Sequence, residues 1–203
     1  DDHHLRTGFL GTPWLLPALT SIGRDDLAMR LLLNETYPSW GFEISMGATT
    51  MWERWNSLGP DGEFGPVSMN SFNHYAYGAV GDWMFDHLGG LQIVEPGYRR
   101  VRIAPLLGHG GPTRVDCSVR TARGLVASQW QLEGDRLTLN VVVPPNTSAD
   151  VVIPAVAADA VTEGGRPATD VGGVRSHAFA DGQLTLHIGS GRYAFVARVQ
   201  AEE

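Results

Sequence analysis

The sequence predicts a helical part followed by an antiparallel β-sandwich, because the hydrophobic period changes along the chain. Up to about residue 95, apolar residues recur at helical spacing, whereas after Pro96 they alternate with polar residues. The alternating runs are separated by turns rich in Gly, Pro, Asn and Asp, which is typical of a sandwich. We therefore expect two domains, residues 1–95 and residues 96–203.

The helical part contains three candidate helices. Segments 12–23 and 24–36 are expected to form a short-looped antiparallel hairpin. Thr12 is the expected N-cap of the first helix, with a proline at the first helical position, where its missing N–H costs nothing. The third candidate covers residues 71–90, with Ser71 as its cap and a Gly-Gly pair at its end.

The β part consists of alternating strings such as RLTLNVVVPP, ADVVIPA, QLTLHI and RYAFVARV. The single cysteine, Cys117, lies in another alternating stretch. We expect it to be a small buried side chain, because one cysteine cannot form an internal disulfide. The residues expected in the core of the sandwich are Trp130, Val141, Val143, Val152, Phe195 and Val199.

Composition and charge exclude several classes of partner. Hydrophobic residues make up 43% of the 203 residues, which is enough for a folded core. The 15 Lys and Arg against 22 Asp and Glu give a net charge of −7 with no basic stripe, so nucleic acid and anionic membranes are not expected partners. No apolar run reaches the roughly 20 residues of a membrane helix. The histidines lack ligand spacing, so no metal or other cofactor is expected.

The stretch MGATTMWERWNSLGP, residues 46–60, contains the first candidate functional residues. It places Glu53 between Trp52 and Trp55. Indole rings stack on the C–H faces of sugars, and carboxylates act there as acids, bases or hydrogen-bond acceptors. The alternative is that the indoles belong to a core and that Glu53 with its neighbour Arg54 is surface charge. A single carboxylate also falls short of a glycosidase mechanism, which normally uses two.

A second polar cluster follows in the string NSFNHYAYG, which contains His74. The histidine suits a sugar-binding site as a hydrogen-bond partner for hydroxyl groups. A structural histidine is the competing interpretation.

An Arg54 side chain that reached Glu53 would favour the ionised form of the Glu53 carboxyl group, but adjacent residues on a helix point apart.

The chain resembles the bacterial α-L-rhamnosidases of glycoside hydrolase family 78. The strings TGFLGTP, GATTMWERW and FNHYAYG occur in the order and spacing of that family. PGYRRVRIAPLLGHG then resembles the start of the family's C-terminal β domain. The resemblance covers about 155 residues and fades beyond Pro154. It implies the last helices of an (α/α)₆ barrel, followed by an antiparallel β-sandwich.

The resemblance also implies an activity and roles for particular residues. The family hydrolyses terminal α-L-rhamnose from rhamnosides with inversion. By motif, Glu53 is the general base, His74 binds rhamnose, and Trp52 and Trp55 flank the base, where either could face the sugar. The family's general acid lies in an acidic motif upstream, and no carboxylate here has a matching context; those near the site are Glu35, Glu43 and Glu63.

These implications make the chain the C-terminal portion of a longer enzyme. Its expected partners are a rhamnose-containing glycoside and the rest of the parent chain upstream, and the start DDHHLRTG fits a cut inside a longer protein. By itself the chain is expected to be inactive. Two alternatives remain: an (α/α)₆ hydrolase that acts on another sugar, and a carbohydrate-binding or structural fragment without catalysis.

Overall fold

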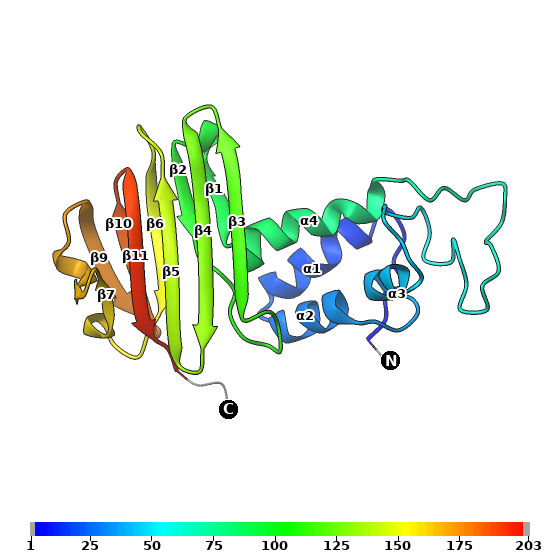
Figure 1. The fold of residues 1–203 in the computed structure, drawn as a ribbon, viewed down its shortest axis with the longest axis horizontal. Coiled ribbons are helices and arrows are strands. Elements are labelled where there is room, and N and C mark those ends of the chain that lie inside the picture. Colours follow the sequence, from blue (N-terminus) through cyan, green and yellow to red (C-terminus); the bar gives the residue numbers. More distant parts are fainter. Residues whose placement is uncertain (1–2, 201–203) are drawn as a thin grey trace. The chain divides into compact units, whose positions relative to one another are not determined.

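The computed structural model describes residues 3–200, which form two compact units. The division lies between Trp83 and Met84, and His109–Gly111 group with the first unit. The first unit is helical, and the second contains two β-sheets (Figure 1). The predicted order of helices followed by a sandwich is confirmed.

The first unit contains the predicted hairpin of two helices. α1 spans Thr12–Ser21 and α2 spans Asp25–Leu33, and they lie side by side (Figure 1). Gly23 ends α1 with a φ of 72°, a left-handed conformation that glycine adopts without a steric penalty. The N–H of Arg24 then closes the turn onto the carbonyl of Leu19 at 2.9 Å. A glycine between the two helices thus produces the short connection that the sequence predicted.

The predicted cap of α1 is wrong by one residue. Gly11 is the N-cap, and Thr12 is the first residue of the helix. A turn precedes the helix, because the N–H of Thr12 already donates to the carbonyl of Gly8 at 3.0 Å. The Thr12 hydroxyl donates to the carbonyls of Thr7 and Gly8, at 3.1 and 3.0 Å, rather than accepting from the helix.

The third predicted helix begins later than expected. Its first turn is a 3₁₀ segment, Ala76–Ala79, which is followed by α4, Val80–Trp83, and a π-helical turn, Met84–Leu88. Ser71 does not cap it, because the Ser71 N–H and carbonyl are both bonded to Glu53. A backbone engaged in this way cannot start a helix at the same place.

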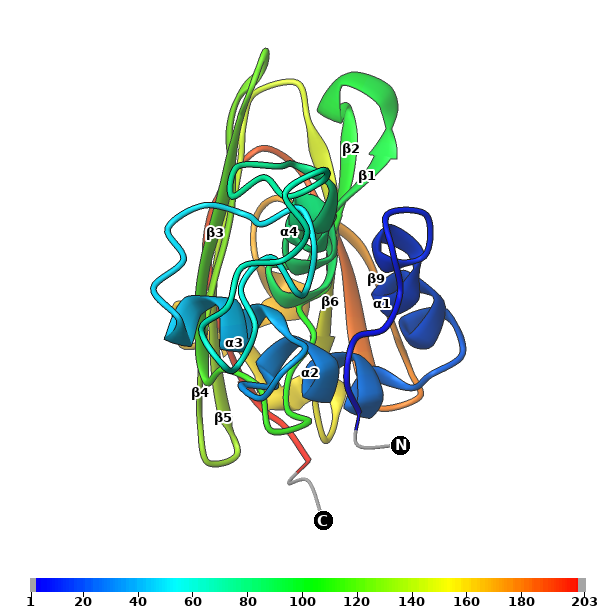
Figure 2. The same cartoon turned by 90° about the vertical axis from the view of Figure 1, so that its right-hand side faces the viewer.

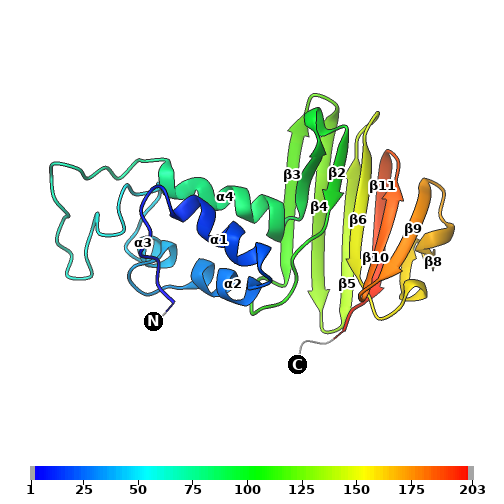
Figure 3. The same cartoon turned by 180° about the vertical axis from the view of Figure 1, so that it is seen from behind.

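The structure contains a further short helix that the sequence did not predict. α3 spans Trp40–Ser45, and the Ser39 hydroxyl caps it by accepting the N–H of Phe42 at 3.0 Å. From α3 to Ala76 the chain forms a long excursion (Figure 3). A single β-bridge, Leu58 with Phe64, is the only regular pairing within this stretch.

The second unit is a sandwich of a five-stranded and a six-stranded sheet. Figure 2 shows β3, β4 and β5 in one layer and β1, β2, β6 and β9 in the other. The first sheet has the order β1 (Leu91–Glu95), β2 (Arg100–Ile103), β6 (Ser148–Pro154), β10 (Gln183–Ile188), β9 (Val174–Ala180). The second has the order β3 (Arg114–Thr121), β4 (Gly124–Glu133), β5 (Arg136–Val143), β11 (Gly191–Arg198), β7 (Val161–Glu163), β8 (Arg166–Pro167).

One strand pair departs from the predicted antiparallel arrangement. β2 pairs with β6 in parallel, with Arg102 opposite Asp150. Parallel neighbours require a crossover connection, and here the crossover consists of β3, β4 and β5 in the other sheet. β1 lies just ahead of the expected domain boundary at residue 95 and pairs with β2.

The core between the two sheets follows the predicted alternation. All six expected core residues are buried, with Phe195 fully buried and Trp130 2% exposed. Val152 is buried outside the main cluster, because the inward positions of β6 are 149, 151 and 153. Cys117 is free and buried as expected, and burial raises the pKa of its thiol.

Candidate functional site

The segment that carries Glu53 runs beside the segment that carries His74. The N–H of His74 donates to the carbonyl of Met51 at 2.8 Å, and the N–H of Glu53 donates to the carbonyl of Ser71 at 2.9 Å. The Thr50 hydroxyl adds a bond to the carbonyl of Phe72. The two strings that carried the resemblance, 21 residues apart at Glu53 and His74, therefore lie together in the fold.

The Glu53 carboxylate has a defined orientation. Its Oε2 atom accepts the N–H of Ser71 at 2.7 Å, so backbone and side chain of Glu53 both bind the same residue. Glu53 is half-buried and does not lie on a helix. Among residues 3–200, no ion pair joins it to Arg54. The backbone of Ser71, rather than a neighbouring cation, holds this carboxylate.

The His74 ring lies between two aromatic rings. It stacks on Phe9 with ring centroids 4.9 Å apart and on Tyr75 at 5.1 Å. Its Nδ1 atom accepts the N–H of Ala76 at 3.3 Å. In a neutral imidazole one nitrogen accepts and the other donates, so Nε2 carries the proton and is the atom available to donate to a ligand.

The two tryptophans beside Glu53 are both buried. Trp55 stacks on Tyr77 at 3.9 Å, meets Trp40 edge-on at 5.4 Å, and donates from Nε1 to the carbonyl of Thr7 at 2.8 Å. Trp52 is 3% exposed and contacts Phe72 edge-on. Within this unit the indoles pack around the segment that holds Glu53.

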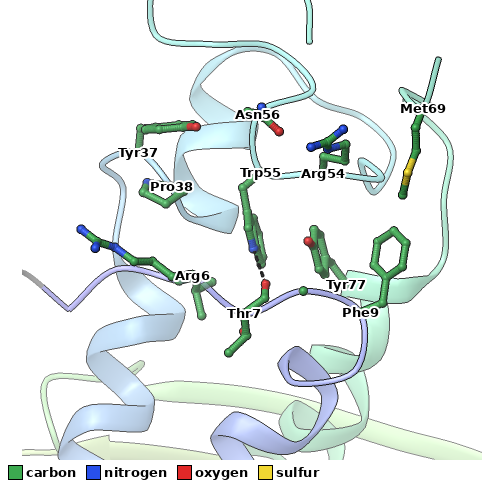
Figure 4. Close-up of a pocket in the computed structure, with 12 residues that line it drawn as sticks. Arg6, Thr7, Phe9, Tyr37, Pro38, Arg54, Trp55, Asn56, Met69 and Tyr77 are labelled. Carbon is green, nitrogen blue, oxygen red and sulfur yellow. Dashed lines mark hydrogen bonds between the residues drawn. The ribbon is translucent and has the colours of Figure 1, made fainter. Parts of the chain in front are cut away.

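A hollow of about 510 Å³ opens beside Trp55 (Figure 4). Arg6, Arg54 and Asn56 supply polar groups, and Phe9, the ring that stacks on His74, forms part of its wall. Neither Glu53 nor His74 lines it. The other lining residues are Leu5, Thr7, Gly8, Tyr37, Pro38, Trp55, Met69 and Tyr77. Aromatic faces beside amide and guanidinium donors can bind the apolar and hydroxyl faces of a neutral sugar.

A buried acid was not recognised from the sequence. Glu43 on α3 is 3% exposed, and burial raises its pKa to about 8, against a hydrogen bond from the backbone N–H of Trp52 that lowers it. Its Oε1 atom has no hydrogen-bond partner among residues 3–200. The sequence did contain a signal of this burial, because Glu43 is an acidic residue within the apolar string WGFEI. The other two carboxylates near the site, Glu35 and Glu63, are exposed.

In the part of the chain that the structure describes, no group of three or more His, Cys, Asp or Glu residues is arranged to hold a metal ion. Within residues 3–200, no helix has the length and apolar character needed to span a bilayer.

Two family models match the chain in succession. The bacterial alpha-L-rhamnosidase 6 hairpin glycosidase domain matches residues 1–88, and the bacterial alpha-L-rhamnosidase C-terminal domain matches residues 90–167. An α-L-rhamnosidase of Formosa agariphila is 50% identical over 153 residues, which are 75% of this chain and 16% of that protein. The chain thus spans about a sixth of the length of this relative.

Solved structures agree with these matches. The Streptomyces avermitilis α-L-rhamnosidase complexed with L-rhamnose is similar with a TM-score of 0.88 at 44% identity, over 97% of this chain and 18% of that one. The α-L-rhamnosidase from Dictyoglumus thermophilum gives a TM-score of 0.82 at 30% identity, over 97% and 21%. The similarity therefore continues past Pro154, where the resemblance was expected to fade. Because both parts are matched in order and at this identity, the chain belongs to the family of bacterial α-L-rhamnosidases.

Proposed function

We propose that this chain is the C-terminal part of an inverting α-L-rhamnosidase that releases terminal α-L-rhamnose from rhamnosides. The observation that supports this proposal most directly is the orientation of the Glu53 carboxylate. It accepts the N–H of Ser71, and the segment that carries Glu53 is hydrogen-bonded to the segment that carries His74. The S. avermitilis relative was crystallised with L-rhamnose, which supports the sugar assigned here. Residues 1–95 are proposed to supply the last helices of the barrel and residues 96–203 the β domain.

Glu53 is proposed to act as the general base. In an inverting reaction the base removes a proton from water as the water attacks the anomeric carbon, and an acid protonates the leaving oxygen from the other side. The two carboxyl groups stand about 6.5–9.5 Å apart to leave room for the water. The Ser71 N–H holds one oxygen of Glu53, which limits rotation of the carboxylate and directs it toward one position of the water.

His74 is proposed to bind rhamnose through Nε2. The bond from Ala76 occupies Nδ1, and the rings of Phe9 and Tyr75 restrict the imidazole plane. A fixed donor of this kind selects a sugar hydroxyl group at a defined position. Trp52 and Trp55 are proposed to act next to the base, and their burial indicates that they exclude solvent and brace the segment.

The general acid is proposed to come from outside residues 1–203. Glu35 and Glu63 are exposed, and Glu43 is buried beside the backbone of Trp52. The relatives are far longer than this chain, which covers 16% and 18% of two of them. The second carboxyl group and most of the sugar pocket therefore belong to the remainder of such a protein.

The test uses the full-length protein that carries this chain. A panel of aryl glycosides is expected to show hydrolysis of the α-L-rhamnoside and little of other terminal sugars. Proton NMR of the first-formed sugar is expected to show the β-anomer of L-rhamnose. Preference for another sugar would favour a different (α/α)₆ hydrolase. A first-formed α-anomer would contradict the inverting mechanism and the role of Glu53 as a base for water.

A further inference from the structure

We propose that the hollow beside Trp55 binds the sugar unit to which the terminal rhamnose is linked, and that this unit is anionic, with a carboxylate or sulfate group held by Arg54. This inference rests on the proposed function, because it names the class of substrate for the same reaction. An enzyme that releases a terminal sugar has every other unit of its substrate in the leaving group. A second hollow for the substrate therefore holds the leaving group.

The hollow adjoins the proposed rhamnose site. Phe9 forms part of its wall and stacks on the ring of His74, with the centroids 4.9 Å apart. Arg54 also lines it and directly follows Glu53 in the chain. Glu53 itself is not in the lining, and its carboxylate accepts the N–H of Ser71. The hollow thus lies next to the proposed catalytic and rhamnose-binding residues without including them, which is the position that a linked sugar unit requires.

The size and the wall of the hollow suit a sugar ring. Its volume of about 510 Å³ is typical of a small-molecule pocket. Tyr77 stacks on Trp55 with centroids 3.9 Å apart, and Phe9 meets Tyr77 at 5.6 Å, so three rings in successive contact form one side. Asn56 adds an amide near Trp55 (Figure 4). Aromatic surface packs against the C–H groups of a sugar, and an amide binds its hydroxyl groups.

The lining of this hollow is positively charged, although the chain as a whole has a net charge of −7. Arg6 and Arg54 line it, and none of the described Asp or Glu residues does. Neither arginine forms an ion pair with another described residue. A second hollow of the helical unit, beside α2, contains Arg30 together with Asp26 and Glu35. A neutral sugar would leave the charge of the first hollow unmatched, whereas an anionic sugar matches it.

Arg54 is held in a position to bind the anion. Its N–H donates to the Ser57 hydroxyl at 3.2 Å, and its carbonyl accepts the N–H of Ser57 at 3.0 Å. Ser57 is fully buried, so this turn fixes the backbone of Arg54. A half-buried guanidinium presents a planar set of donors that binds a carboxylate or sulfate through paired hydrogen bonds. Arg6 is exposed and lies on the opposite side of Trp55 in Figure 4, so it contributes charge rather than a contact to the same group.

The experiment uses the full-length protein and three α-L-rhamnosyl disaccharides that share a linkage which the protein cleaves. They differ only at C6 of the leaving-group sugar, which carries a hydroxymethyl group, a carboxylate or a sulfate ester. We expect kcat/KM to be at least about tenfold higher for an anionic substrate than for the neutral one, on the scale of one charge-assisted pair. The carboxylate and sulfate substrates show which of the two anions the hollow takes.

Two substitutions assign this preference to the hollow. Arg54→Gln removes the guanidinium, and the ratio of kcat/KM for the anionic and neutral substrates is expected to fall at least about tenfold. Asn56→Asp adds a negative charge with little change of shape, and it is expected to lower the same ratio. The control is Arg24→Gln at the exposed start of α2, outside this hollow. It makes the same change in net charge and should leave the ratio unchanged.

Two results would overturn the inference. One is a kcat/KM for the neutral substrate that equals or exceeds the values for both anionic substrates in the parent. The other is a parental ratio in Arg54→Gln, or in Asn56→Asp if only that variant folds. Failure of the proposed function is recognised separately, because the unsubstituted protein would then not hydrolyse an aryl α-L-rhamnoside, which carries no second sugar.

Discussion

Glu43 and Glu53 are ten residues apart in the sequence, and their carboxyl groups have different surroundings. Glu53 is half-buried and accepts the N–H of Ser71. Glu43 is 3% exposed, and burial raises its pKa to about 8. Two acids of one type therefore differ in burial and in hydrogen bonding, and burial favours the neutral form of Glu43.

Substitution of Glu53 tests the base directly. Glu53→Gln keeps the shape and the bond from Ser71 but cannot take a proton. In the full-length protein we expect kcat to fall by at least about 10²-fold, the contribution of general base catalysis, with a partial return when azide replaces water as nucleophile. Steady-state kinetics on an aryl α-L-rhamnoside measure both effects. The exposed Glu63→Gln is the control, and a rise in KM alone would make Glu53 a binding residue.

Substitution of His74 tests sugar binding. His74→Ala removes the Nε2 donor, and we expect KM for the rhamnoside to rise on the order of tenfold, which corresponds to one hydrogen bond of about 1.4 kcal/mol. The effect on kcat should be smaller than that of Glu53→Gln. His177→Ala, at an exposed position of β9, is the control. Unchanged KM and unchanged inhibition by free L-rhamnose would rule out this contact.

At the scale of elements, α3 links pH to stability through Glu43. Its pKa is raised from the ordinary value of 4.5 to about 8, so between these values the folded state keeps a proton that the unfolded state has lost. Stability from this group is thus complete below about pH 4.5, and falls with rising pH up to about pH 8.

This linkage predicts a difference between two proteins. Unfolding free energy should fall through this window at up to about 1.4 kcal/mol per pH unit from Glu43 alone, and Glu43→Gln should remove that part of the slope. Melting temperatures of the parent and the variant from pH 5 to pH 8 measure it. Parallel curves for the two proteins would show that Glu43 titrates normally.

In the sandwich, Asp150 joins three neighbouring strands. Asp150 lies on β6. Its Oδ2 atom accepts hydrogen bonds from Nε and Nη2 of Arg100 on β2, at 2.9 and 2.6 Å, and its Oδ1 atom is hydrogen-bonded to Nδ1 of His187 on β10 at 2.8 Å. Burial acts to raise the pKa of Asp150, but the bonds from His187 and Arg100 outweigh it and lower the pKa. The carboxylate thus stabilises the sheet at neutral pH.

Asp150→Asn should weaken this sheet. The loss of charge-assisted bonds is expected to cost about 1–3 kcal/mol at pH 7. Because the pKa of Asp150 is lowered on folding, its contribution should be lost as pH falls through that value, and the two proteins should converge in acid. Chemical denaturation followed by tryptophan fluorescence, to which the buried Trp130 of the sandwich contributes, measures this. Asp159→Asn, at an exposed position, should have no effect, and equal losses for both variants would contradict the assignment.

At the scale of the whole molecule, the chain corresponds to a small part of the α-L-rhamnosidases that it matches. It spans 16% and 18% of two relatives, although 97% of it matches the S. avermitilis structure. Some large apolar side chains of the helical unit are exposed, such as Trp14 at 72% and Tyr75 at 86%. The family model that matches residues 1–88 describes a domain of six hairpins.

The isolated chain is therefore expected to lack activity. General acid assistance contributes about 10²–10⁴-fold in rate, and the proposed acid lies outside residues 1–203. An aryl α-L-rhamnoside should be turned over by the full-length protein and not by the 203-residue chain at equal concentration. Turnover by the chain that is lost on changing Glu35, Glu43 or Glu63 would place the acid within it.

The sequence by itself determined the features that depend on local pattern. The hydrophobic period distinguished helices from strands, glycine placed the stop of α1, and the alternation identified buried residues such as Phe195. The family strings around Glu53 and His74 led to the rhamnosidase family. These features could be predicted because each depends on residues close together in the chain.

Only the tertiary structure decided the features that depend on distant contacts. Ser71 was expected to cap a helix, but its backbone binds Glu53 instead, and no local pattern reports that competition. The parallel pairing of β2 with β6 arises because the chain crosses to the other sheet between them. The neutral Glu43 arises from burial among residues brought together by folding, and burial raises its pKa because a charge loses the stabilisation of water there.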